Sequence, residues 1–103
     1  MEVNKITEKN RNIINDFMIN RWYSLKMIIR GKEIDMASVD GFYVLDKYAI
    51  VGLITYLINE ENSVMEITSL DSLKENQGIG TILINRVIEE AKKIRCKKIV
   101  LIT

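Results

Sequence analysis

The sequence of 103 residues contains no histidine, no proline and a single cysteine, Cys96. A zinc site built from histidine and cysteine is therefore excluded, we expect no metal, and no disulfide can form within the chain. A chain without disulfides is typical of a reducing compartment. The sequence also lacks internal repeats, low-complexity segments and linkers. We therefore expect a single domain over residues 1–103.

The chain has neither an excess of one charge nor a long apolar run. Its 15 Lys and Arg residues against 14 Asp and Glu residues give a net charge of +1, which argues against a nucleic-acid-binding domain. Charged and amide side chains interrupt residues 1–20, unlike the apolar core of a signal peptide. No run reaches the ~18 apolar residues that span a bilayer. We therefore expect a cytoplasmic protein that binds neither nucleic acid nor membranes.

The N-terminal part predicts a strand followed by a helix. Residues 3–7 read as a short extended segment, and Thr7 is a suitable N-cap for the helix after it. Four apolar residues share one face of that helix: Ile13, Ile14, Phe17 and Met18. Residues 21–39 contain an aromatic pair and an apolar run but show no clear period. The sequence assigns no element to them.

Strands, a long helix and a last strand make up the rest of the chain. Segments rich in β-branched and aromatic residues predict an antiparallel meander over residues 41–45, 48–58 and 63–70. Gly52 indicates a bulge or a close backbone approach. Apolar residues at helical spacing from Ile79 to Ile94 predict an amphipathic helix, and residues 98–103 predict a strand. This order is typical of an α+β fold with a mixed, mainly antiparallel sheet.

Two glycines, Gly78 and Gly80, lie where the long helix begins. The first N–H groups of a helix have no acceptor within it, and the helix dipole is positive there, so such a loop binds phosphate oxygens. The Thr81 hydroxyl adds a donor. A dinucleotide-binding fingerprint needs glycine in place of Leu83, and a P-loop needs Lys followed by Ser or Thr, so both are excluded. Spacing alone leaves two interpretations open, an anion site and a tight turn.

The segment over residues 69–84 resembles the acetyl-CoA motif of the GNAT superfamily of N-acetyltransferases. That motif has Gln or Arg, two residues, Gly, one residue, and then Gly or Ala at a helix start, and residues 41–70 resemble the strands that precede it in that fold. The resemblance implies a GNAT-like fold and transfer of acetyl from acetyl-CoA to an amine of a small molecule or peptide. At one position the chain departs from the motif, because Glu75 replaces the usual Gln or Arg.

The resemblance also implies which residues bind acetyl-CoA. Main-chain amides of the loop would hold the pyrophosphate, and the strand before it would pair with the pantetheine arm. These residues are Gln77, Gly78, Ile79, Gly80 and Thr81 in the loop, and Thr68, Ser69 and Leu70 in the strand. Glu66 is the candidate general base, because alternation along the strand places Glu66, Thr68 and Leu70 on one face. A solvated strand carboxylate is the alternative interpretation of Glu66.

GNAT enzymes commonly take their general acid, a tyrosine, from a helix that follows the strand corresponding to residues 98–103. This sequence ends at Thr103, so the resemblance implies a domain without the C-terminal helix and the last strands. Three explanations stay open: a truncated enzyme, a short protein completed by dimerisation, and a non-catalytic CoA-binding remnant. An unpaired apolar strand pairs readily with another chain. We therefore expect a homodimer through residues 98–103.

Overall fold

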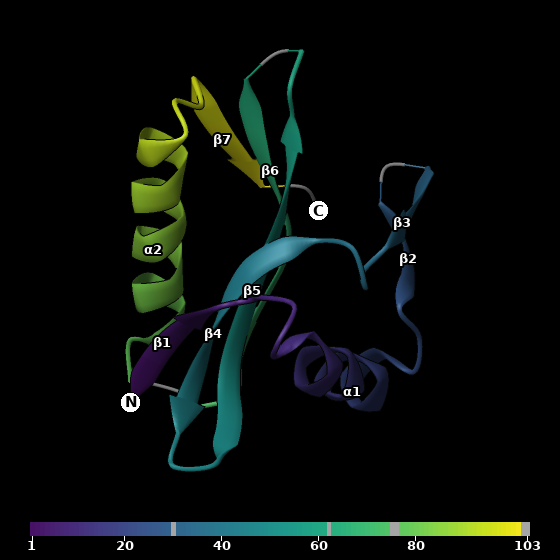
Figure 1. The fold of residues 1–103 in the computed structure, drawn as a ribbon, viewed down its shortest axis with the longest axis vertical. Coiled ribbons are helices and arrows are strands. Elements are labelled where there is room, and N and C mark those ends of the chain that lie inside the picture. The colour runs from purple at the N-terminus through teal and green to yellow at the C-terminus, as the bar shows by residue number, and fades with distance from the viewer. Residues whose placement is uncertain (30, 62, 75–76, 102–103) are drawn as a thin grey trace.

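The computed structural model describes residues 1–29, 31–61, 63–74 and 77–101. Within these residues the chain forms nine elements, which are coloured by residue number in Figure 1. They are β1 (Glu2–Lys5), α1 (Arg11–Trp22), β2 (Lys26–Ile29), β3 (Lys32–Asp35), β4 (Asp40–Asp46), β5 (Ala49–Asn59), β6 (Val64–Ser72), α2 (Ile79–Lys93) and β7 (Lys98–Leu101). No helix in the described part of the chain is both long and apolar enough to cross a membrane.

The main sheet has the strand order β1-β4-β5-β6-β7, and β2 and β3 form a separate hairpin. Neighbouring strands in the sheet are antiparallel, except that β7 runs parallel to β6 after the crossover through α2. Helix α2 covers one face of the sheet, while α1 and the hairpin lie on the other side (Figure 1). The expected α+β fold with a mixed, mainly antiparallel sheet is confirmed.

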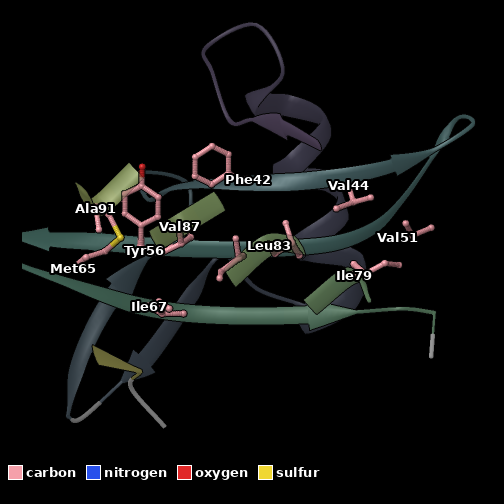
Figure 2. Close-up of a cluster of buried hydrophobic side chains, with 11 residues drawn as sticks. Phe42, Val44, Val51, Tyr56, Met65, Ile67, Ile79, Leu83, Val87 and Ala91 are labelled. Carbon is pink, nitrogen blue, oxygen red and sulfur yellow. The ribbon is translucent and has the colours of Figure 1, made fainter. Parts of the chain in front are cut away.

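Alternate residues of β5 supply two hydrophobic cores, one on each face of the sheet. Ile54 and Tyr56 belong to the cluster under α2, which Figure 2 shows with Leu83 and Val87 of that helix. Leu53 belongs to the cluster under α1. Because β5 is buried on both faces, it reads as a nearly continuous apolar run. The central strand is therefore the framework on which both helices are placed.

Gly52 lets α2 approach the sheet closely. A Cβ atom there would lie 2.4 Å from Cγ2 of Ile79 and 3.1 Å from Cδ1 of Leu83. The pairing of β4 with β5 also shifts register between Val44 and Leu45, next to the Val44–Gly52 pair. Gly52 therefore lies beside a bulge, as expected, and side chains of α2 approach its backbone closely. This contact sets the height of the first turn of α2 above the sheet, where the glycine loop begins.

The N-terminal helix begins later than its sequence indicates. Asn10 occupies the N-cap position before Arg11, so the prediction that Thr7 caps the helix is wrong. The Asn10 side chain folds back, accepting a hydrogen bond from the Thr7 N–H (2.7 Å) and donating one to the Lys5 carbonyl (3.0 Å). These bonds compete with helix for the intervening residues. Ile13, expected on the packed face, is 61% exposed.

The segment over residues 21–39, to which the sequence assigned no element, contains the β2–β3 hairpin. Its strands pair with each other and not with the main sheet. Met27 and Ile34, a directly opposed pair, pack against the cluster under α1. The hairpin is held by packing against the rest of the domain, which a local pattern does not reveal.

Candidate functional site

Strand β6 has different neighbouring strands along its first and second halves, within the residues that the structure describes. From Val64 to Ile67 it pairs with β7, and this is the full extent of β7 pairing among the described residues. From Thr68 to Ser72 it keeps β5 on one edge, and no described strand pairs with its other edge. Backbone N–H and C=O groups at a free sheet edge can pair with an extended ligand. Within the described part of the chain, the second half of β6 therefore presents such an edge.

A β-bulge lies where this open edge begins. Tyr56 of β5 pairs with Ile67, while the preceding residue, Thr55, pairs with Ser69. Thr68 is therefore the extra residue of β6. A bulge leaves the extra residue outside the regular ladder and bends the strand, and here it occurs one residue beyond the last pair with β7. The bulge thus lies beside the last described pair between β6 and β7.

The bulge also separates the side chains of Glu66 and Leu70. Directly opposed residues of antiparallel strands point to the same face, and Glu66 is opposite Leu57 whereas Leu70 is opposite Ile54. Leu57 packs with the cluster under α1 and Ile54 belongs to the cluster under α2. The prediction that Glu66, Thr68 and Leu70 share one face is therefore wrong, because the extra residue inverts the alternation. Glu66 faces the α1 side.

Hydroxyl groups hold the bulge in place. The Oγ1 atom of Thr55, whose side chain is fully buried, lies 2.7 Å from Oγ1 of Thr68 and 2.5 Å from Oγ of Ser69. A buried hydroxyl without a partner is costly, so these three groups satisfy one another. Sequence reasoning missed Thr55. Its signal is a lone polar residue within the apolar run of a central strand, which must find a partner in the folded protein.

The start of α2 is open to an approaching anion. Gly78 is the N-cap residue, with φ 71° and ψ 16°, and since it has no side chain it makes no capping hydrogen bond itself. The first turn carries no acidic side chain. A Cβ atom on Gly78 or Gly80 would have no heavy atom within 4 Å, so the space beside both residues is free. Uncapped amides at the positive end of a helix dipole favour a phosphate group there.

The other predicted loop residues have different surroundings. Gln77 and Thr81 are exposed, whereas Ile79 is buried against the sheet under α2. The side chain of Ile79 therefore anchors the helix, and only its backbone is available to a ligand. Glu75, at which the chain departs from the motif, lies outside the described residues. The structure thus brings Gln77 to Thr81 together at the helix start, close in sequence to the open half of β6.

Ion pairs engage two carboxylates near this end of the sheet. Lys74, just beyond β6, pairs with Asp46 at the end of β4, and this hydrogen bond and charge lower the pKa of Asp46 below its ordinary value of 3.8. Arg21 of α1 lies 3.5 Å from Oδ1 of Asp71 on β6. Both carboxylates have a cationic partner, which reduces the repulsion that they would exert on a phosphate at the helix start.

A cavity of about 430 Å³ lies between the hairpin and the α1 face of the sheet. Glu66 of β6 and Leu57 of β5 line it from the sheet. The remaining described lining residues come from the hairpin and the turn after it: Ile29, Lys32, Glu33, Ile34, Asp35 and Ser38. Sequence reasoning named Glu66 but missed the other lining residues, because the hairpin shows no readable pattern.

The β6 edge, the bulge and the helix start lie in a mixed, mainly antiparallel sheet flanked by two helices. The model of the acetyltransferase (GNAT) family matches residues 7–103. The chain therefore belongs to the GNAT acetyltransferase family.

Curated relatives include two uncharacterized proteins of Bacillus subtilis (strain 168), YdhI and YxbD. Each is 38% identical to this chain over 94 residues, which are 90% of the chain and 58% of the relative. The chain thus spans somewhat more than half the length of these relatives. Neither name states an activity, so the likeness leaves the acceptor open.

Solved structures with the same fold include acetyltransferases of known type. The chain matches a ribosomal-protein-alanine N-acetyltransferase from Brucella melitensis biovar Abortus 2308 with a TM-score of 0.71 at 14% identity, over 97% of this chain and 77% of that one. It matches the aminoglycoside N-acetyltransferase AAC(6')-Iy in complex with CoA with a TM-score of 0.70 at 12% identity, over 99% and 76%. At these identities the likeness shows the fold.

Proposed function

We propose that this chain binds acetyl-CoA along the open half of β6 and at the start of α2, and that it transfers the acetyl group to an amine. The observation that carries the proposal is the continuity of two features. Within the described residues, a free strand edge begins at Thr68, and the next element begins at Gly78, which has no side chain to cap the helix amides. An extended chain with amide groups and a pyrophosphate at one end matches both features.

Each part of acetyl-CoA has a proposed binding segment. The amide groups of the pantetheine arm pair with backbone groups of Thr68, Ser69 and Leu70, as an added strand would. The pyrophosphate accepts hydrogen bonds from the main-chain amides of residues 77–81, of which Gly78 and Gly80 leave the space beside the backbone free. Membership of the GNAT family supports this placement, as does a structure of the same fold that holds CoA.

Glu66 is the proposed general base. An amine must lose a proton before or during its attack on the thioester carbonyl, whereupon the new amide bond forms and CoA leaves as a thiolate that takes up a proton. Glu66 is half-buried, lies on β6 two residues before Thr68, and lines the cavity on the α1 face. Its carboxylate accepts the amine proton directly or through a water molecule.

Two assays on this chain test the proposal. Calorimetry with acetyl-CoA measures binding, and release of the CoA thiol in the presence of a panel of amines measures transfer. In the Glu66→Gln variant we expect kcat to fall about 100-fold, with the Kd of acetyl-CoA unchanged. The matched control is Glu61→Gln, an exposed carboxylate in the turn after β5, which should retain full activity.

The outcomes separate the alternatives. Binding of acetyl-CoA without thiol release from any amine would favour the non-catalytic CoA-binding protein. Absence of binding at millimolar acetyl-CoA would refute both versions of the proposal. Equal loss of activity in both glutamate variants would remove the argument for Glu66 as the base.

The proposed homodimer concerns β7, which ends the sheet. No strand in the described part of the chain pairs with its outer edge, and Ile102 and Thr103 lie outside that part. The homodimer through residues 98–103 stays a prediction, as does the cytoplasmic location. Small-angle scattering at micromolar concentration tests the dimer, and a strictly monomeric species would count against it.

A further inference from the structure

The cavity beside Glu66 combines a carboxylate with an apolar wall. Ile29 is buried, and Ile34 and Leu57 are half-buried around the enclosure. These three side chains come from β2, β3 and β5, so the wall is assembled from separate parts of the chain. Its volume of about 430 Å³ lies in the lower part of the range for small-molecule sites, about 300–1,000 Å³. The enclosure suits a compact ligand.

The register of the hairpin shows which side chains share the face of this wall. Ile29 opposes Lys32, and alternation places both on the face of Ile34. Ile28 and its partner Glu33 lie on the opposite face, and Ile28 is 76% exposed. Only one of the two faces of the hairpin therefore contributes isoleucine side chains to the cavity.

Two of the three lining carboxylates are engaged elsewhere. Oε1 of Glu33 lies 3.6 Å from Nζ of Lys26, and Oδ1 of Asp35 accepts a hydrogen bond from the Ala37 N–H at 3.0 Å. Among the described residues, Glu66 has neither an ion-pair nor a hydrogen-bond partner. Its carboxylate is therefore the one of the three that has no partner in the described part of the chain, and it can pair with an ammonium group of a ligand.

An apolar wall distinguishes between amines, because polar groups of a ligand that lie against it find no hydrogen-bond partner there. A branched or aromatic hydrocarbon body gains from burial against Ile29, Ile34 and Leu57. The part of a ligand that carries hydroxyl and ammonium groups would lose water against these three side chains without gaining hydrogen bonds from them. The long Lys32 side chain, exposed near the hairpin tip, adds a positive charge that disfavours a second ammonium group.

We propose that the acceptor of this enzyme is a primary amine with a compact apolar body. Its amino group lies beside Glu66, and its hydrocarbon part packs against Ile29, Ile34 and Leu57. This inference rests on the proposed acetyl transfer, since it names the class of amine that enters the same site. It differs from the polyhydroxylated polycations on which an aminoglycoside N-acetyltransferase acts.

A binding experiment without acetyl-CoA tests the cavity by itself. We expect 2-phenylethylamine, titrated to millimolar concentration into the chain with labelled methyl groups, to shift the NMR signals of Ile29, Ile34 and Leu57. The signal of Ile28, on the other face of the hairpin, should not move. The matched alcohol, 2-phenylethanol, should bind several-fold more weakly because it lacks the charge that pairs with Glu66. Absence of shifts, or equal binding of the alcohol, would overturn the inference.

A kinetic experiment tests the apolar wall. With acetyl-CoA present, we expect kcat/KM for 2-phenylethylamine to exceed that for methylamine by about 10 to 200-fold. In Ile34→Ser this ratio should fall about tenfold through KM, and in the control Ile28→Ser it should stay the same. Faster transfer to kanamycin than to 2-phenylethylamine would overturn the inference while leaving acetyl transfer intact. If acetyl-CoA does not bind, the proposed function fails, and the NMR titration still decides the nature of the cavity.

Discussion

Replacing Gly78 by alanine perturbs the helix start on which the proposed pyrophosphate site depends. Gly78 has a φ of 71°, in the left-handed region, and a Cβ atom there would have no heavy atom within 4 Å. The penalty therefore comes from the backbone alone, about 1–2 kcal/mol for an L-residue in this conformation. Alanine also restricts the unfolded chain, which offsets part of the penalty. We expect the free energy of unfolding to fall by about 1 kcal/mol.

Gly80→Ala is the matched control, because it adds the same methyl group two residues further on. Gly80 lies in the first turn of α2, and a Cβ atom there also has free space. Its φ is not in the left-handed region, so alanine should raise the free energy of unfolding by up to about 1 kcal/mol through its better helix propensity. The two variants should thus differ by about 2 kcal/mol, although each adds one methyl group to the same turn.

The two variants should also differ in acetyl-CoA affinity. The strained Gly78→Ala variant relieves its backbone by turning the loop amides away from the ligand, and each 1.4 kcal/mol lost weakens binding about tenfold. We expect at least about a tenfold increase in Kd for this variant and a near-normal Kd for Gly80→Ala, where the GNAT motif accepts alanine.

Urea unfolding followed by circular dichroism measures the stabilities, and calorimetry measures the Kd values. Equal stability of the two variants would refute the argument from backbone conformation. If Gly78→Ala lowers the free energy of unfolding but leaves the affinity for acetyl-CoA unchanged, the left-handed turn does not position the pyrophosphate.

Three further expectations follow from buried and paired groups. Gly52→Ala places a Cβ atom 2.4 Å from α2, so urea unfolding should show a loss of about 1–3 kcal/mol; an unchanged midpoint would contradict the close approach. Lys74 lowers the pKa of Asp46 below 3.8, so the pair stabilises the fold above that pH and this contribution is lost as pH falls through the folded pKa. NMR titration of Lys74→Met should return the pKa of Asp46 towards 3.8, and no change would exclude the pairing. Burial raises the pKa of Tyr56 above 10.0, so the unfolded state loses this proton first and the free energy of unfolding falls as pH rises above 10.0. In urea unfolding at alkaline pH, Tyr56→Phe should lessen this fall in stability. An unaltered fall would assign the loss of stability to other groups.

The elements whose apolar residues follow a regular pattern could be predicted from the sequence. The apolar residues of α2 repeat at helical spacing, and β5 is an apolar run, because each must bury its face against the other. The close approach at Gly52 was also predictable, since glycine inside a strand removes a side chain where another element packs. Both inferences depend on short-range pattern, and both are confirmed.

The β2–β3 hairpin and the bulge at Thr68 were not predictable in this way. The hairpin is short and pairs with no other strand among the described residues, so its stability comes from packing against the cluster under α1. The bulge depends on how the hydroxyls of Thr55, Thr68 and Ser69 meet across two strands. Strand alternation, applied without that contact, placed Glu66 and Leu70 on one face and was wrong.

The sequence by itself determined the GNAT motif at the start of α2 and the order of the elements around it. Both are local properties, because helix and strand patterns and a glycine-containing helix start are set by neighbouring residues. The tertiary structure alone decided that β6 carries a bulge at Thr68, that Glu66 turns towards the α1 side, and that Ile29, Ile34 and Leu57 line a cavity beside it. These features depend on the pairing register of residues distant in the chain, which a local pattern does not contain.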